Sequence, residues 1–325
     1  MATSTTSILN RFLEPMKALP LLLLCTASLS ADEPEWVTVG DPGNPADKSG
    51  FGAVAYEFQI MKHEVTCAQY AAFLNAMATT DPLGLYIPQM DGAPMPKGLD
   101  DIRSEQGCIV RTGEKGSYRY SISAGNDKKP IVNISLPNAL RFANWMHGGQ
   151  TETGAYNITK GRALAPRSAE ALVWLPSEDE WYKAAYYDAA AKRYWRYATR
   201  SDEPPVSCKP DAAQTNAANY YWTDGKNNGV SNGYAFSQSD YYKPGSIYLF
   251  DVGSYPAARS HYGTLDQSGS VWEWTEGIVY ETKRVIRGGG WPDEALSLRS
   301  TTRTSVLPTS LYKDVGFRLC RKLKP

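Results

Sequence analysis

The chain has 325 residues, and its 34 basic and 34 acidic side chains give a formal net charge of zero. A balanced charge leaves no excess of basic residues for a phosphate backbone, so bulk charge argues against a nucleic-acid partner. The chain contains 21 tyrosines and 9 tryptophans against 8 phenylalanines, together with 27 glycines and 21 prolines. This composition predicts modest regular secondary structure and many loops held by aromatic side chains.

Residues 1–31 have the pattern of a signal peptide. Basic residues precede an apolar run from Ala18 to Cys25, and small residues follow up to Ala31. The run is much shorter than the roughly 20 residues that a membrane-spanning helix needs, so cleavage near Ala31 is expected and a membrane span is not. The pattern predicts a secreted or periplasmic protein with residues 32–325 as its mature chain, which is long enough for one large domain or two ordinary ones. Met16 is an alternative start.

Three segments carry helix start signals. Thr66 and Gln69 have the spacing of a capping box, and apolar residues follow them at spacings of three and four. Ser135 is expected to cap a second helix, with Pro137 in its first turn. The run Ser177–Glu180 forms another capping box, and its acidic first turn suits the positive end of the helix dipole. We therefore predict three helices that begin at these residues.

Two long inserts separate the predicted helices. The first, near residues 81–130, contains 109–111 and 117–122 on either side of a glycine turn, which predicts a β-hairpin. The second insert covers residues 148–171. A separate segment, residues 204–246, has the composition of a loop. Loops of uneven length often carry binding specificity. Both inserts are therefore expected either beside a ligand face or as covers for sheet edges.

Two tryptophan-containing turns occur late in the chain. Asp266–Trp274 places Glu273 between two tryptophans, and Val285–Trp291 contains three consecutive glycines. Because side chains alternate along a strand, the two rings are expected on one face and the carboxylate on the other. A buried carboxylate needs a partner, and a cation is the natural one.

These turns resemble the C-terminal part of the sulfatase-modifying factor family, whose type member is the formylglycine-generating enzyme. Further blocks in the family's order are Phe58–Thr66, Val132–Ser135, Trp174–Trp181, Leu298–Ser300 with Arg303, and Gly316–Leu319. The resemblance implies an α+β fold in a single C-type-lectin-like domain with much irregular loop structure. It also requires the segment Gly316–Arg318 to lie in the same sheet as the tryptophan turns.

The resemblance further implies a structural calcium ion. In the family it is held by the block that matches the side chains of Asp266 and Glu273 and the carbonyls of Gly269 and Val271. Ligands that are all oxygen atoms suit a hard cation. The alternative is that Glu273 forms an ion pair with a buried arginine such as Arg287.

A second calcium site of the family matches Asn219 and the carbonyl of Tyr220, with Asp224 as a further candidate ligand. The three histidines of the chain lie far apart and show no metal-binding spacing. Zinc sites and three-histidine iron sites are therefore not expected.

Formylglycine-generating enzymes bind copper through two cysteines between the glycine-rich turn and the final Gly-Phe-Arg. In this chain the matching positions are Ala295 and Ser300, and no cysteine occurs between Cys208 and Cys320. Thiolates suit Cu(I), whereas a hydroxyl binds it poorly. Copper is therefore not expected, and the resemblance describes a family member that lacks the catalytic cysteine pair.

Four cysteines follow the predicted signal peptide, namely Cys67, Cys108, Cys208 and Cys320. In an exported protein they allow two disulfides in three connectivities. Cys67 lies at the start of the first predicted helix and Cys108 lies in the first insert, which favours this pair. Free buried thiols are the alternative.

Two functions from different classes remain. The first is an exported, calcium-stabilised, lectin-like binding module without catalysis, because aromatic faces and arginines suit a peptide or a carbohydrate. Its groove is expected to be lined by Trp274, Trp291, Arg299, Ser300 and Arg303. The second is a formylglycine-generating-type oxidase, or a related peptide- or metabolite-tailoring enzyme, with a non-standard metal site. A redox metal would distinguish the second from the first.

Overall fold

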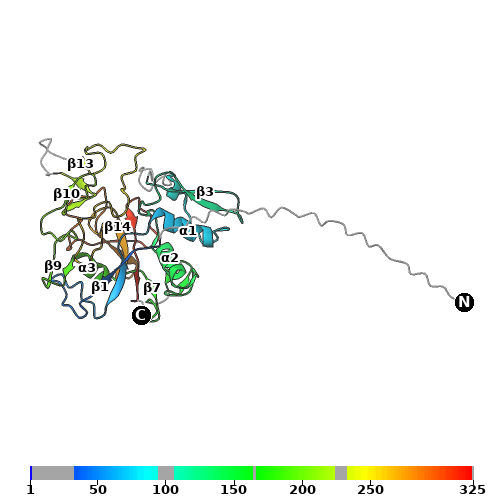
Figure 1. The fold of residues 1–325 in the computed structure, drawn as a ribbon, viewed down its shortest axis with the longest axis horizontal. Helices are drawn as coiled ribbons and strands as arrows, with labels where there is room; N and C mark the ends of the chain where they lie inside the picture. The colour runs from blue at the N-terminus through cyan, green and yellow to red at the C-terminus, as the bar shows by residue number, and fades with distance from the viewer. Residues whose placement is uncertain (2–32, 94–105, 164–165, 224–232, 324–325) are drawn as a thin grey trace. The chain divides into compact units, whose positions relative to one another are not determined.

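The computed structural model describes Met1 and residues 33–93, 106–163, 166–223 and 233–323. The predicted signal peptide therefore lies, Met1 apart, outside the described residues. Ala31–Pro325 forms one compact unit. Short strands and a few helices make up this unit (Figure 1), which confirms the predicted α+β class and the single domain.

Three α-helices are present in the described residues: α1 (Cys67–Met77), α2 (Leu136–Gly148) and α3 (Glu178–Tyr186). Both predicted capping boxes are confirmed. The Gln69 N–H donates to the Thr66 hydroxyl over 3.2 Å, and the Thr66 N–H donates back to the Gln69 side chain over 3.0 Å. At α3 the same pair of bonds joins Ser177 and Glu180 over 3.1 and 2.7 Å.

The predicted cap of α2 is wrong. Ser135 occupies the N-cap position, but its hydroxyl makes no capping hydrogen bond. The first N–H group of the helix, that of Leu136, instead donates to the carbonyl of Pro308 over 2.8 Å. A segment distant in sequence therefore satisfies one of the free N–H groups at the start of this helix.

The first four-stranded sheet has the order β1-β2-β18-β7, and all of its neighbouring strands are antiparallel. Its strands are β1 (Trp36–Val39), β2 (Phe58–Met61), β18 (Cys320–Arg321) and β7 (Val173–Trp174). The side chains of Val39, Phe58 and Ile60 are fully buried in the main core. The last strand of the chain thus lies between the first hairpin and a strand from the middle of the sequence.

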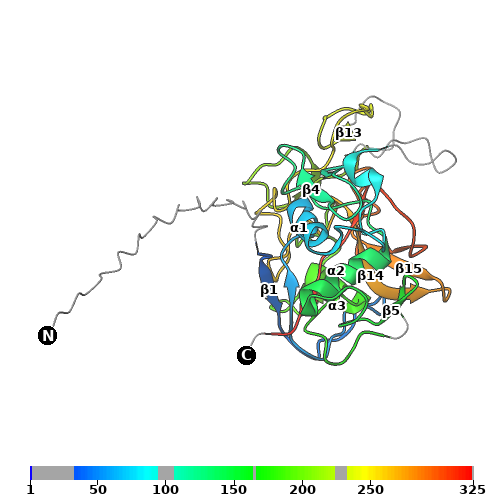
Figure 2. The same cartoon turned by 90° about the vertical axis from the view of Figure 1, so that its right-hand side faces the viewer.

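The second four-stranded sheet has the order β16-β15-β14-β17. Its strands are β14 (Trp272–Val279), β15 (Lys283–Arg287), β16 (Thr304–Val306) and β17 (Val315–Gly316). β14 and β15 form a hairpin, drawn in orange in Figure 2, with the exposed Tyr280 in its turn. β17 runs parallel to β14 and pairs Gly316 with Glu273, which confirms that the C-terminal segment joins the sheet of the tryptophan turns.

The remaining strands form small two-stranded ribbons. They are β3 (Ile109–Thr112) with β4 (Arg119–Ile122), β5 (Ile158–Thr159) with β6 (Arg162–Ala163), β8 (Tyr187–Asp188) with β9 (Arg193–Tyr194), β10 (Val206–Ser207) with β11 (Ala217–Ala218), and β12 (Tyr221–Trp222) with β13 (Gly233–Tyr234). A short 3-10 helix, η1, covers Pro88–Asp91. The predicted hairpin of the first insert is confirmed by β3 and β4, which pair with antiparallel register.

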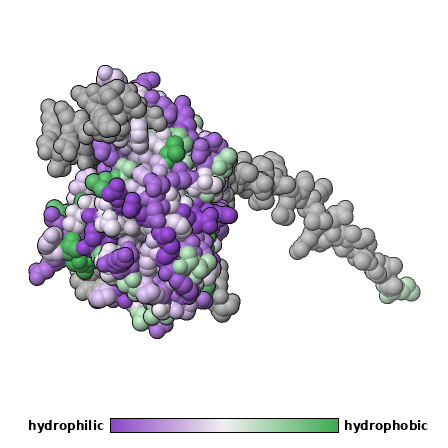
Figure 3. Space-filling model, turned by 90° about the vertical axis from the view of Figure 1, so that its left-hand side faces the viewer, coloured by the Kyte–Doolittle hydropathy of each residue, from purple (hydrophilic) through white to green (hydrophobic). Residues whose placement is uncertain are grey.

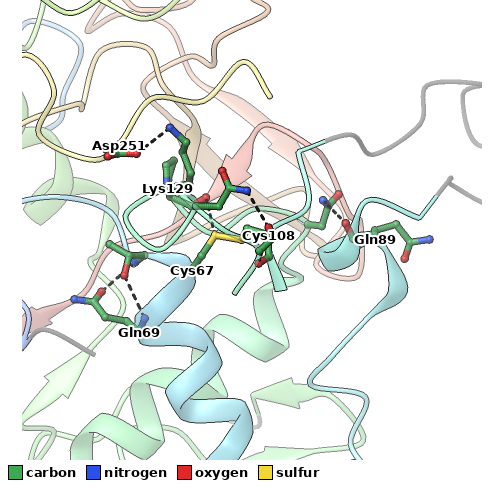
Figure 4. Close-up of a disulfide and its surroundings, with 11 residues drawn as sticks. Cys67, Gln69, Gln89, Cys108, Lys129 and Asp251 are labelled. Carbon is green, nitrogen blue, oxygen red and sulfur yellow. Dashed lines mark hydrogen bonds and ion pairs between the residues drawn. A yellow bond between two sulfur atoms is a disulfide. The ribbon is translucent and has the colours of Figure 1, made fainter. Parts of the chain in front are cut away.

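A disulfide joins the first helix to the first insert. It links Cys67, the first residue of α1, to Cys108, which directly precedes β3, and the two Cα atoms are 6.3 Å apart. Figure 4 shows this bond between the start of α1 and the insert. The preferred pairing is therefore confirmed, while Cys208 and Cys320 are free thiols.

The surface carries few apolar groups on the face drawn in Figure 3. Hydrophilic residues predominate there, and apolar residues form only small groups. Within the described part of the chain, no helix combines the length and the apolar character that crossing a membrane requires.

Candidate functional site

Helix α3 contacts the β14–β15 hairpin through buried polar side chains. The carboxylate of Glu178 accepts hydrogen bonds from Arg287 and Arg303, each over 2.6 Å. Trp181 donates its indole N–H to Glu273 over 2.9 Å. Glu178 and Trp181 are three residues apart, so they lie on the same face of α3 and both reach the hairpin.

The partner of Glu273 is Arg318, and both side chains are fully buried. The guanidinium donates from Nε over 2.7 Å and from Nη2 over 2.8 Å. The alternative prediction, that Glu273 pairs with a buried arginine, is confirmed, but its example, Arg287, is wrong. Arg287 is the backbone neighbour of Glu273 in the hairpin, but its side chain binds Glu178. A cationic partner for Glu273 is thus present, and it comes from the C-terminal segment.

Arg318 has no donor left for a second buried acid, Glu64. Its other N–H groups donate to three backbone carbonyls over 2.8 to 3.0 Å. The nearest approach of Glu64 to Arg318 is 3.7 Å, and both Glu64 oxygens are buried without a hydrogen bond to any described residue. Burial raises the pKa of Glu64 well above its usual value, which favours the protonated form.

A small polar cavity lies beside Asp266. Its volume is about 10 Å³, and its lining includes Asp266, Asn219 and Gln267. Asp266 accepts the N–H of Gly253 over 2.6 Å, and burial raises its pKa to about 6. The Oε1 atom of Gln267 is buried with no hydrogen-bond partner among the described residues. The cavity has room for about one water molecule or one small ion.

The structure brings the two predicted calcium blocks into contact. The N–H of Ser270 donates to the Asn219 carbonyl over 2.8 Å, and a Cβ atom on Gly269 would lie 2.6 Å from that oxygen. Gly269, at φ +88°, therefore meets two needs that only glycine satisfies here. Val271 is buried beside Trp291. Asp266 and Asn219, both with oxygen atoms in their side chains, line one cavity.

Two other predicted ligand oxygens already have partners. The Glu273 carboxylate is bound by an arginine and an indole, and the Tyr220 carbonyl accepts from Ser207 over 2.7 Å and from Ala235 over 3.2 Å. Asp224 lies outside the described residues. No three His, Cys, Asp or Glu side chains group as metal ligands in the described part of the chain. Amide and backbone oxygens would therefore have to complete a calcium shell.

Trp274 is not a groove residue, and that prediction is wrong. Its side chain is 0% exposed and belongs to the main core, where its indole donates to the carbonyl of Ile134 over 2.7 Å. Trp272 is buried in the same core, as expected, and donates its indole N–H to Asp293 over 2.7 Å. The alternation along β14 thus directs both rings into the interior.

The predicted groove residues other than the two tryptophans contact α3, the β14–β15 hairpin and Tyr197. Arg303 binds the helix through Glu178, and Arg299 donates to the Tyr197 hydroxyl over 3.3 Å. Ser300 is buried, and its carbonyl accepts from an arginine over 2.8 Å. Ala295, the other position that matches a family cysteine, packs beside Leu298. Through these contacts, residues 295–303 support the β14–β15 hairpin.

Trp291 is instead the base of an aromatic cluster, which we call the aromatic wall: Tyr242, Tyr248 and Trp291. Tyr248 stacks on Trp291 with ring centroids 4.8 Å apart and planes at 22°, and Tyr242 stacks on Tyr248 at 5.0 Å and 22°. Lys313 places its ammonium 4.7 Å from the Tyr242 ring and 5.0 Å from the Trp291 ring. Tyr248 and Trp291 are each 1% exposed, whereas Tyr242 and Lys313 are partly exposed and form the accessible rim.

Two carboxylates lie next to the aromatic wall and were missed by the sequence analysis. Asp293 accepts the N–H of Gly290 over 2.8 Å, and Asp314 lies 3.1 Å from the place that a Cβ on Gly290 would occupy. Burial, and then the charge of Asp293, raise the pKa of Asp314 to about 7. The only sequence signal was the third glycine, which leaves space for Asp314.

Comparisons with known proteins agree with this architecture. A family model described as "Sulfatase-modifying factor enzyme 1-like domain" matches residues 40–323. A hercynine oxygenase of Mycobacterium tuberculosis is 28% identical over 205 residues, which are 54% of this chain and 41% of that protein. A formylglycine-generating enzyme of the same organism is 26% identical over 247 residues, which are 70% of this chain and 66% of that protein.

Among solved structures, a crystal structure of CarF aligns with a TM-score of 0.52 and 20% identity, covering 90% of this chain and 99% of that one. This likeness concerns the fold. The chain spans less than two thirds of the length of the curated relatives that it matches. Because the family model covers almost the whole described domain, the chain belongs to the sulfatase-modifying factor family.

Proposed function

We propose that this chain is an exported, calcium-stabilised binding domain that takes a carbohydrate on the aromatic wall and does not generate formylglycine. The observation that carries this proposal is the partly exposed ring of Tyr242, which stacks on the buried rings of Tyr248 and Trp291 beside two carboxylates. Aromatic faces pack against the C–H faces of sugar rings, and carboxylates accept hydrogen bonds from sugar hydroxyls.

Support for a non-catalytic role comes from the positions that match the family's cysteines. Ala295 offers no metal ligand, and Ser300 is buried against the hairpin. The two free thiols, Cys208 and Cys320, lie elsewhere: Cys208 packs near Tyr255 and Cys320 pairs with β2 and β7. Soft thiolate ligation of Cu(I) is therefore not supported at this site.

Support for calcium comes from the cavity beside Asp266. One carboxylate, the Asn219 amide and the unpaired Gln267 carbonyl provide hard oxygen donors around a space of one ion. Support for export comes from the Cys67–Cys108 disulfide, because disulfides persist mainly in oxidising compartments.

The binding proposal is tested with a glycan array and two matched tyrosine variants. Tyr242→Ala removes the rim of the aromatic wall, whereas Tyr241→Ala removes a neighbouring ring that is 84% exposed and outside the stack. We expect Tyr242→Ala to weaken glycan binding about tenfold, which corresponds to about 1.4 kcal/mol, and Tyr241→Ala to leave it unchanged. Binding of peptides but not glycans, or equal effects of both variants, would contradict the proposal.

The metal proposal is tested by elemental analysis of the purified exported protein. We expect calcium without copper or iron, and a lower unfolding temperature after chelation that calcium restores, because a ligand of the native state stabilises it by mass action. Asp266→Asn is expected to lose the calcium-dependent part of this stability. The calcium site would be refuted if the protein contained no calcium and if neither chelator nor added calcium changed its unfolding temperature.

A second candidate function is an oxidoreductase, and the names of the relatives, hercynine oxygenase and formylglycine-generating enzyme, favour it. It predicts a stoichiometric redox metal and oxygen consumption with a cysteine-containing sulfatase-motif peptide or a small metabolite. Oxygen uptake that depends on a bound metal would establish this candidate over the binding domain.

A further inference from the structure

Tyr248, which contacts both other rings of the aromatic wall, lies in a segment without regular secondary structure, residues 246–252. Gln106, which lies about 140 residues earlier in the chain, holds this segment in place. Its side-chain amide donates to the Ser246 carbonyl over 3.0 Å and accepts the Tyr248 N–H over 2.7 Å. Gln106 is 2% exposed, so water does not compete for these two bonds.

Gln106 is itself held by the disulfide. It precedes Cys108 by two residues, and Cys108 is bonded to Cys67 at the start of α1. The N–H of Cys108 also donates to the Met90 carbonyl over 2.7 Å. The backbone next to Gln106 is therefore fixed covalently to a helix.

The far end of the segment is tied to the same place. Lys129 forms an ion pair with Asp251 at 2.8 Å, and the Val252 N–H donates to the Lys128 carbonyl over 2.9 Å. The carbonyl of Lys129 accepts the N–H of Cys67 over 2.9 Å. Figure 4 shows Lys129 and Asp251 beside the disulfide. Both ends of residues 246–252 thus attach to backbone that meets at Cys67–Cys108.

The segment then transmits this constraint to the wall. Tyr248 stacks on Trp291, and its carbonyl accepts from the Asn219 side chain over 2.9 Å. The Tyr248 hydroxyl accepts the Lys243 N–H over 2.6 Å, which fixes the chain next to Tyr242. A shift of the Tyr248 backbone would therefore move two of the three rings.

We infer that Gln106 is a positioning residue of the aromatic wall, and that the Cys67–Cys108 disulfide orders the wall through Gln106. The role of the wall in ligand binding rests on the proposed function, but its geometry does not. The first test therefore measures the wall without a ligand.

The test uses ¹⁹F NMR of protein labelled with 5-fluorotryptophan, with the Trp291 resonance assigned by Trp291→Phe. Gln106→Ala, the pair Cys67→Ala/Cys108→Ala, and the combination of all three are compared. We expect the first two to shift and broaden the Trp291 resonance while that of Trp174, in β7, stays in place. We expect the combined variant to match the larger of the two effects, because constraints in series are not additive.

Asn75→Ala is the matched control. Asn75 anchors the same insert at its other end, where it accepts the Tyr120 N–H over 3.0 Å and donates to the Tyr120 carbonyl over 2.7 Å. Its side chain bonds Tyr120 and Ala71 and makes no hydrogen bond to residues 246–252, so we expect the Trp291 resonance to stay in place in this variant. A Trp291 shift as large in Asn75→Ala as in Gln106→Ala would reduce Gln106 to general support of the fold.

Gln106→Glu gives a second measurement that is independent of the loss of packing. It keeps an acceptor for the Tyr248 N–H and removes the donor to Ser246, so hydrogen exchange at the Tyr248 amide is expected to remain slow in Gln106→Glu and to accelerate in Gln106→Ala. Equal exchange in both variants, or an unmoved Trp291 resonance in folded Gln106→Ala, would overturn the inference. An ordered, Gln106-dependent wall that binds no glycan would refute the proposed function alone.

Discussion

The buried arginine Arg318 shows how single residues carry the electrostatics of this fold. One cation faces the carboxylate of Glu273 at 2.7 Å and that of Glu64 at 3.7 Å, with all three side chains excluded from water. Removing two charges from water costs several kcal/mol, and only a close, fully bonded pair offsets it. Glu273 has such bonds and Glu64 does not, so the two acids respond differently to substitution.

We predict that Glu273→Gln destabilises the protein by about 3–5 kcal/mol, because it leaves the Arg318 charge buried with a neutral partner. Urea unfolding at neutral pH measures this loss. Arg193→Ala, which breaks an exposed ion pair with Asp202, serves as the control and should cost at most about 1 kcal/mol. Similar losses of stability in both variants would show that the buried Glu273–Arg318 pair contributes no more than an exposed ion pair.

The pH dependence of Asp314 provides a second residue-level prediction. Burial and the neighbouring Asp293 raise its pKa to about 7 from 3.8. A raised carboxyl pKa means that the folded state favours the protonated form. Its stabilising contribution is therefore complete below pH 3.8 and is lost as the pH rises towards about 7.

Carboxyl ¹³C NMR of Asp314 measures this pKa directly. In Asp293→Asn the midpoint is expected to fall, because a repulsive charge is removed, but to remain above 3.8, because burial is the larger cause. A midpoint near 4 in the unaltered protein would contradict the raised pKa that burial and the neighbouring Asp293 give Asp314.

Among the secondary-structure elements, α3 is the one that organises the site. Its capping box fixes where the helix begins, and that start sets Glu178 and Trp181 against Arg287 and Glu273. We predict that Ser177→Ala costs about 1 kcal/mol of stability. Ser135→Ala at α2, where no capping bond exists, should cost less, and denaturant unfolding of the two variants compares them directly.

The elements that the sequence predicted are those with local causes. Capping boxes join residues three apart, and the hairpin of the first insert pairs strands across a short glycine turn. The partner of Glu273 was missed because Arg318, in the connection between β17 and β18, reaches it only through the tertiary fold. Asp314 was missed for the same reason, since only the folded chain brings it to Gly290. Asp293 is three residues from Gly290 and was missed because it belongs to no recognised motif.

At the scale of the whole molecule, the disulfide restricts the unfolded chain. Cys67 and Cys108 are 41 residues apart, and closing a loop of that length is expected to contribute about 4 kcal/mol. We predict that Cys67→Ala/Cys108→Ala lowers the free energy of unfolding by up to this amount, as measured by urea denaturation. No change in a non-reducing buffer would show that the loop is ordered without the bond.

β18 is synthesised late but lies inside the first sheet, so that sheet can be completed only near the end of synthesis. β2 stays without its second neighbour until Cys320 and Arg321 have been made, because β18 lies between β2 and β7. At about 5–20 residues per second, ribosomes need roughly 15–60 s to pass from β1 to β18. During that interval the first hairpin exposes unpaired backbone, so a nascent chain of this design depends on being kept from premature association until its last strand arrives.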